Sequence, residues 1–70
     1  MPKLLQIKPQ QLLNILLQKG FYITRQRGSH VRLKNDNGNY VTLAIHNKPV
    51  SKGTLLSILR QAGLSKGDIL

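Results

Sequence analysis

A Gly-Ser-His block at residues 28–30 holds the side chain of this chain that is best suited to chemistry. The block follows a run of charged and apolar residues that is typical of a strand. Histidine is the side chain whose ordinary pKa lies nearest neutrality, so it gives or takes a proton at physiological pH. On a strongly basic chain, His30 is therefore a candidate for proton transfer beside a bound phosphate. This combination predicts chemistry on RNA.

The net charge of the chain indicates a polyanionic partner. The 70 residues include 11 Lys and Arg but only two acids, Asp36 and Asp68, which gives a formal charge of +9. Such a charge favours nucleic acid or an acidic protein surface. The alternative is charge that serves solubility or a ribosomal role. A chain of this length has room for one small core, so we expect one domain over residues 1–70 without a large active-site cleft.

The residue types also exclude several classes of site. The chain has no cysteine, which rules out a disulfide framework and a thiolate metal site. Two histidines and two distant acids make a poor set of metal ligands, so we expect neither a metal nor a small-molecule cofactor. No apolar run approaches the roughly 20 residues that span a bilayer, and no signal peptide is recognisable. We expect a cytoplasmic protein with no membrane contact.

Two amphipathic helices are predicted, one near each end of the chain. Residues 9–19 place their apolar side chains on a broad arc of a helical wheel, with proline in the first turn and Gly20 in the left-handed position after the end. A second apolar stripe follows Ser51, whose hydroxyl can cap the helix by accepting from the Thr54 N–H, and it ends at Gly63.

Between the helices the apolar period changes to two, which predicts strands near residues 21–24, 30–34 and 40–46. In all three the apolar residues are odd-numbered. Because successive side chains of a strand point to opposite faces, an antiparallel meander would have a covered odd face and an open even face.

The loop between the second and third strands decides their register. A three-residue loop over residues 36–38, with Gly38 in the left-handed position, places the odd-numbered residues of the two strands opposite one another. A two-residue Asn37-Gly38 turn would instead set Leu33 opposite Thr42 and put the apolar faces on opposite sides. The predicted pairs are Leu33 with Val41 and Val31 with Leu43.

The same type of loop is predicted over residues 26–28, with Gly28 at a positive φ. The predicted pairs are Ile23 with Val31, Phe21 with Leu33, Thr24 with His30 and Tyr22 with Arg32. His30 would then lie mid-sheet on the open face, between Thr24 and Ala44 and diagonally across from His46.

The order of these elements predicts an α+β fold of two layers, α-β-β-β-α. Two helices would cover one face of a three-stranded antiparallel sheet. This is the order of a double-stranded-RNA-binding fold.

Two blocks of sequence are distinctive when they occur in this order. The first is Gly20-Phe21 followed by residues 25–30 (RQRGSH), and the second is residues 52–64 (KGTLLSILRQAGL), with a hairpin and His46 between them. Together they resemble the HicA family of bacterial toxins, and the similarity covers nearly the whole chain.

The resemblance implies an mRNA interferase of a toxin–antitoxin pair, built on the double-stranded-RNA-binding fold. It implies that His30 is the catalytic histidine and that a HicB-like antitoxin holds the toxin inactive. We expect that antitoxin to cover the face with His30. The family commonly has proline two residues before the second histidine, where this chain has Ala44 before His46. The role of His46 therefore stays open between catalysis, phosphate binding and structure.

Metal-independent cleavage of RNA needs a base for the 2′-hydroxyl proton, an acid for the leaving 5′-oxygen, and cations around the phosphate. His30 can serve as the base or the acid. The RNA-binding candidates are Arg25, Arg27, Ser29, Arg32, Lys34, His46 and Lys52. Each cation could instead belong to a solvated basic face, and Arg32 could stack on Tyr22.

The aromatic side chains on the even face have two interpretations. Tyr22 and Tyr40 can stack unpaired bases, or they can simply cover the sheet.

Two functions other than catalysis fit the same residues. One is a non-catalytic RNA-binding module of the same fold, in which His30 does no chemistry. The other is an interaction protein whose basic face docks an acidic partner.

Overall fold

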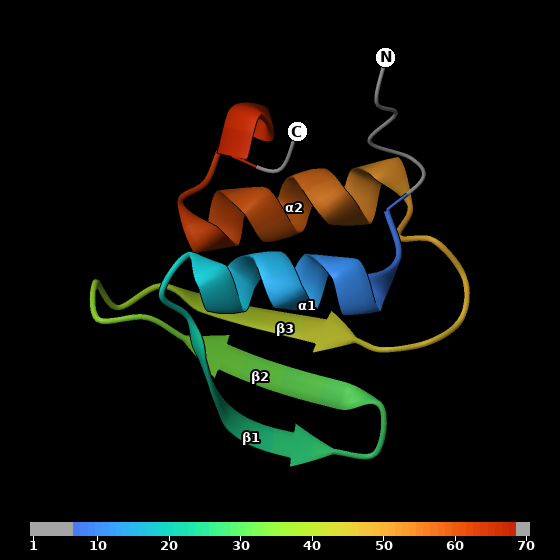
Figure 1. Cartoon of the computed structure of the whole chain (residues 1–70), viewed down its shortest axis with the longest axis horizontal. Helices are drawn as coiled ribbons and strands as arrows, with labels where there is room; N and C mark the ends of the chain where they lie inside the picture. The colour runs from blue at the N-terminus through green and yellow to red at the C-terminus, as the bar shows by residue number, and fades with distance from the viewer. Residues whose placement is uncertain (1–6, 69–70) are drawn as a thin grey trace.

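The secondary-structure elements follow the predicted order α-β-β-β-α. The computed structural model describes residues 7–68. Its elements are α1 (Pro9–Gln18), β1 (Tyr22–Arg27), β2 (His30–Lys34), β3 (Tyr40–Ala44), α2 (Lys52–Ala62) and the 3-10 helix η2 (Lys66–Asp68). Both helices lie on one side of the sheet (Figure 1), whose antiparallel strands are ordered β1-β2-β3. The predicted α+β fold is confirmed. The prediction of one domain over residues 1–70 includes residues outside the described range and stays a prediction.

The ends of the two helices have the predicted local signals. α1 begins at Pro9, where the fixed φ of the ring suits the first turn. The Ser51 hydroxyl accepts a hydrogen bond from the Thr54 N–H at 3.3 Å, which caps α2. α2 ends at Gly63, whose φ of +70° is the left-handed conformation that favours glycine. Within residues 7–68, neither helix is long and apolar enough to cross a membrane.

One carboxylate holds η2 in place. Asp68 accepts hydrogen bonds from the Ser65 N–H at 2.7 Å and from the Ser65 hydroxyl at 3.1 Å, and it lies 3.6 Å from Lys19 Nζ. These contacts lower the pKa of Asp68 below its ordinary value, and the backbone hydrogen bond from Ser65 contributes most. One of the two acids of the chain is thereby engaged outside the sheet.

The core lies between the helices and one face of the sheet. Its strand members are Val31, Leu33, Val41 and Leu43, all at most 2% exposed. The other members come from the helices and loops: Leu12, Leu13, Leu16, Phe21, Val50, Leu55, Ile58, Leu59 and Ala62. Burying each of the larger apolar side chains stabilises the fold by roughly 1.5–3 kcal/mol. Because side chains alternate along a strand, the residues between the buried ones face away from the helices. We call that side of the sheet the open face.

The hairpin between β2 and β3 has the predicted register. Leu33 pairs with Val41 and Val31 pairs with Leu43. The loop over residues 36–38 is closed by a hydrogen bond from the Asn35 N–H to the Asn39 carbonyl at 3.2 Å. Gly38 has a φ of +87°, as predicted for the left-handed position of this loop. The apolar pattern therefore predicted this register correctly, and the alternative two-residue turn does not form.

The predicted register of β1 is wrong. Ile23 pairs with Leu33 instead of Val31, and His30 pairs with Arg27 instead of Thr24. The connection is a two-residue turn, Gly28-Ser29, and not the three-residue loop over residues 26–28. Gly28 does have the predicted positive φ, +57°, and with no positive φ at Ser29 the turn meets the requirement of type II′, which has glycine first.

A β-bulge at Thr24 accounts for the rest of the difference. Ile23 is opposite Leu33, yet Arg25 is opposite Arg32, so Thr24 is an extra residue in β1. The Thr24 hydroxyl donates to the backbone carbonyl of Arg32 at 3.2 Å. The extra residue reverses the alternation of side chains, so that Arg25 and Arg27 lie on the open face although they are odd-numbered.

The open face consists of three rows that run across the sheet. In each row the residues come from β1, β2 and β3 in turn. The rows are Tyr22, Lys34 and Tyr40; Arg25, Arg32 and Thr42; and Arg27, His30 and Ala44. His30 is thus exposed on the central strand, as predicted, but it is the first residue of that strand and lies at the end of the sheet.

Candidate functional site

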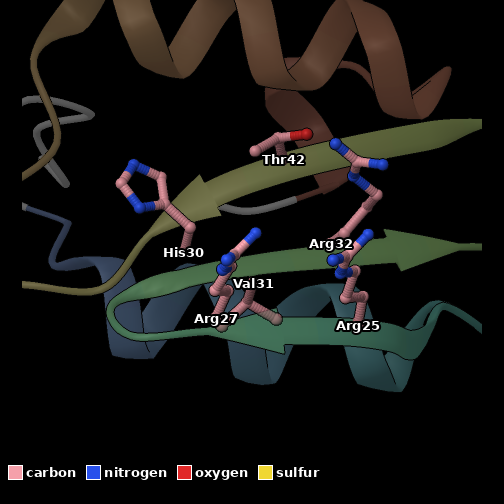
Figure 2. Close-up of a pocket in the computed structure, with 6 residues that line it drawn as sticks. All are labelled: Arg25, Arg27, His30, Val31, Arg32 and Thr42. Atoms are coloured by element: carbon pink, nitrogen blue, oxygen red, sulfur yellow. The ribbon is translucent and has the colours of Figure 1, made fainter.

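The open face is hollowed beside His30. A depression of about 320 Å³ is lined by Arg25, Arg27, His30, Val31, Arg32 and Thr42. Figure 2 shows the imidazole and the three arginine side chains on the side of the sheet away from the helices. We call this depression the arginine hollow. It brings the predicted catalytic residue together with three of the predicted RNA-binding residues.

Backbone features set the positions of these side chains. The turn at residues 28–29 sets Arg27 directly opposite His30, and the same register sets Arg25 opposite Arg32. The bulge at Thr24 then brings Ile23 opposite Leu33. On the other side, His30 pairs with Ala44, and the Ile45 N–H donates to the Ser29 carbonyl at 2.7 Å. The backbone at His30 is therefore held by both neighbouring strands.

The arginine hollow has no counter-charge of its own. Arg25 and Arg32 are paired directly across two strands, an arrangement that is destabilising for like charges. The chain has two acids; Asp36 is in the loop after β2, and Asp68 is engaged by Ser65 and Lys19. Among residues 7–68, the four side chains of the hollow that carry nitrogen make no side-chain hydrogen bond or ion pair. An anion placed here would relieve the repulsion between the arginines.

His46 lies in a different depression. It follows β3 and lines a second hollow of about 240 Å³, together with Lys48, Ser51 and Thr54 from the start of α2 and its preceding loop. Thr42 borders both hollows. The structure therefore does not bring His46 into the arginine hollow with His30. We call this depression the His46 hollow.

The remaining predicted RNA-binding residues lie around these hollows without lining them. Ser29 is in the turn before β2, and Lys52 is the first residue of α2 and is exposed. Lys34 is on the open face, with its Nζ 5.3 Å from the centre of the Tyr40 ring. The suggested stacking of Arg32 on Tyr22 does not fit the register, because Tyr22 is opposite Lys34.

Thr42 was missed by the sequence analysis. It is opposite Arg32 in β3 and forms part of the wall of both hollows. The available signal was that Thr42 is an even-numbered residue in a strand whose odd-numbered residues are apolar. That signal is weak, because threonine is common in strands for its β propensity alone.

The part of the chain that the structure describes has no group of three or more metal-ligating side chains. The arrangement instead suits a bound phosphate, since guanidinium groups donate several hydrogen bonds to such an anion and a histidine stands beside them.

Comparison with known proteins assigns the chain to a family. A search of curated proteins found no match. The family model described as HicA toxin of bacterial toxin-antitoxin matches residues 9–64, which span all the strands and both α-helices. The chain therefore belongs to the HicA family of toxins of bacterial toxin–antitoxin systems.

Proposed function

We propose that this HicA toxin is an endoribonuclease that cleaves mRNA at the arginine hollow, with His30 as its catalytic residue. The observation that supports this most directly is that His30 shares one hollow with Arg25, Arg27 and Arg32. The proposed substrate, mRNA, places the activity in the cytoplasm.

The proposed reaction is an internal transfer of the phosphate. The ribose 2′-oxygen attacks phosphorus as the bond from phosphorus to the 5′-oxygen breaks. The 2′-hydroxyl loses its proton and the leaving 5′-oxygen gains one, so no proton is consumed overall. His30 serves as the base that takes the first proton or as the acid that supplies the second, and water serves in the other role. The products are a 2′,3′-cyclic phosphate and a free 5′-hydroxyl.

The arginines have an electrostatic part in this proposal. Negative charge gathers on the phosphate oxygens in the transition state, and guanidinium groups fixed around that position stabilise it. Arg25 and Arg32 already face each other across the strands, so little rearrangement is needed to grip a phosphate. One positioned acid or base typically accelerates a reaction by ~10²–10⁴-fold. The enzyme is therefore expected to be slow.

The reaction is proposed to need no metal ion. The whole chain offers two histidines, two acids and no cysteine, and the two acids lie off the open face. Carboxylate oxygens are the ligands that Mg²⁺ prefers in proteins. The hollow presents cations in their place, which suits a mechanism in which arginine replaces the metal.

Membership of a toxin–antitoxin family implies an antitoxin partner. We propose that a HicB-like antitoxin covers the open face and His30. The uncompensated positive charge of that face favours an antitoxin surface rich in Asp and Glu.

The proposed function is tested with purified protein, single-stranded RNA and the variant His30→Ala. We expect the variant to fold, to keep most of its RNA affinity, and to lose cleavage. The unmodified protein should release fragments with a 2′,3′-cyclic phosphate or its opened form, and a chelator of divalent metals should leave the rate unchanged.

Two results would contradict this mechanism. Cleavage by His30→Ala equal to that of the unmodified protein would remove His30 from catalysis. Cleavage that requires added divalent metal would remove the metal-independent route. If neither protein cleaves but both bind RNA, the chain is a non-catalytic RNA-binding module.

A further inference from the structure

We infer that the row Tyr22, Lys34 and Tyr40 is a subsite for unpaired bases, so that the toxin binds single-stranded RNA along its open face. We call this row the aromatic row. The inference rests on the proposed function only for where the RNA is cut; binding by the aromatic row is a separate property.

Both tyrosines of the aromatic row are exposed to solvent. Tyr22 is 44% exposed and Tyr40 is 56% exposed, and they are the only tyrosines of the chain, which also has no tryptophan. They lie on β1 and β3, on either side of Lys34, on the side of the sheet away from both helices. Within the described residues, no element packs over this face (Figure 1).

The chemistry of the row fits nucleotides. Aromatic rings on an open sheet stack with bases of any sequence, because every base has a π face. Lys34 stands between the rings, with its Nζ 5.3 Å from the centre of the Tyr40 ring, so a cation is present where the phosphate between two stacked bases would lie. The row is also continuous with the next one, Arg25 and Arg32, and hence with the arginine hollow.

The same features disfavour a duplex as the ligand. Paired bases are stacked on each other inside a helix, so their faces are not available to the two tyrosines. Double-stranded-RNA-binding domains contact two successive minor grooves and the phosphates between them. Here α1 itself contains no charged residue (PQQLLNILLQ), whereas the open face has four cations besides His30. The open face therefore offers phosphate contacts that the surface of α1 does not.

The distance along β2 places the base subsite a few nucleotides from the cut. His30 and Lys34 are four residues apart on one strand, which corresponds to ~13 Å at the usual rise per residue. A stacked strand advances ~3.4 Å per nucleotide, so the aromatic row would hold a base about four nucleotides from the scissile phosphate. An extended strand would cover the same distance with fewer nucleotides.

Tyrosine fluorescence tests the inference directly, because Tyr22 and Tyr40 are its only sources in this chain. The full chain carrying His30→Ala, which should not cut, is titrated with three ligands of equal charge. These are a single-stranded RNA, a duplex of half its length, and an abasic oligomer of the same length as the single strand. We expect only the single strand to quench the fluorescence, and we expect the abasic oligomer to bind more weakly.

Substitutions in the same background separate stacking from other effects. Tyr40→Ala should weaken single-strand binding by roughly 5- to 100-fold, and Tyr40→Phe, which keeps the ring, should restore it. Leu17→Ala is the matched control, because Leu17 is 42% exposed but lies on α1, and it should leave the affinity unchanged.

The possible failures are distinct from a failure of the proposed function. Equal quenching by the abasic oligomer, or unchanged affinity in Tyr40→Ala, would overturn the base subsite whether or not the protein cleaves RNA. If Tyr40→Ala keeps its RNA affinity but loses affinity for the antitoxin, the row is a protein-docking surface, and the inference is wrong. Quenching by single-stranded RNA with no cleavage by the unmodified protein would support the subsite and contradict only the catalytic proposal.

Discussion

Arg25 lies directly opposite Arg32 on the open face, and it should contact phosphate directly. Arg25→Gln is expected to weaken single-stranded RNA binding by about tenfold, since a hydrogen bond to a charged group contributes roughly 1.5–3 kcal/mol. It should also reduce the slope of log affinity against log salt by about 0.7, the value for one phosphate contact on a single strand. Binding is measured between low and physiological salt.

Lys66→Gln is the control for this substitution. It removes the same charge from η2, which lies outside the sheet, so it should leave the slope nearly unchanged. Equal effects of the two substitutions would show that only the net charge matters and that Arg25 makes no specific contact.

At the scale of elements, the bulge in β1 yields a prediction about deletions. Deleting Thr24 removes the bulge and leaves Arg25 opposite Arg32, with Ile23 still opposite Leu33. This shortened strand should keep the fold and most of the RNA affinity. Deleting Gln26 also removes the bulge, but it moves Arg25 opposite Val31, on the helix side, and brings Thr24 opposite Arg32.

The two deletions are matched in length and differ in one arginine on the open face. We expect the Gln26 deletion to bind RNA about tenfold more weakly than the Thr24 deletion, by loss of one charged contact. Circular dichroism checks that both fold. Equally weak binding by two folded variants would show that the bulge itself, and not the placement of Arg25, makes the hollow.

The strands differ in how much of their surface is buried, and this difference explains why the register of β2 and β3 could be predicted from the sequence and that of β1 could not. Val31, Leu33, Val41 and Leu43 are buried on one face, and a slip by one residue would expose all of them, so the apolar pattern set that register correctly. β1 is an edge strand with every residue exposed, including Ile23 at 43%. With no buried face to fix it, its register was set by the glycine turn and the bulge, which the alternation could not reveal.

The same reasoning applies to the site. The sequence indicated the three arginines by their residue type, and it indicated His30 by its residue type and by the Gly-Ser-His block that contains it. It placed His30 opposite Thr24, and it grouped His46 with His30 across the sheet. The structure instead assigns His46 to a hollow formed with the start of α2, since the chain leaves the sheet after Ala44. Long-range placement of this kind depends on where a strand ends, which is the least predictable feature of an element.

At the scale of the whole molecule, a formal charge of +9 with both acids off the open face predicts how the antitoxin is recruited. We expect rapid association that slows as salt is added, because complementary charge mainly raises the association rate. Co-expression with the adjacent reading frame should give copurification, loss of toxicity, and protection of His30 from diethyl pyrocarbonate. Modification of His46, measured in the same sample, reports whether the His46 hollow is covered too.

One combination of results would rule out direct occlusion. A bound partner that leaves His30 open to the reagent and cleavage undiminished would have to act elsewhere.

The hydrogen bond between Ile45 and Ser29 has a consequence for how the toxin loses activity. Together with the pairs to Arg27 and Ala44, it incorporates the backbone of His30 into the ladder of the central strand, and not into a loop. The entropic cost of ordering this residue is therefore met during folding and not at each substrate encounter. Its backbone should therefore open only together with the strands that hold it. Activity should then follow the folded fraction, so that core substitutions far from the hollow reduce toxicity only as far as they unfold the protein.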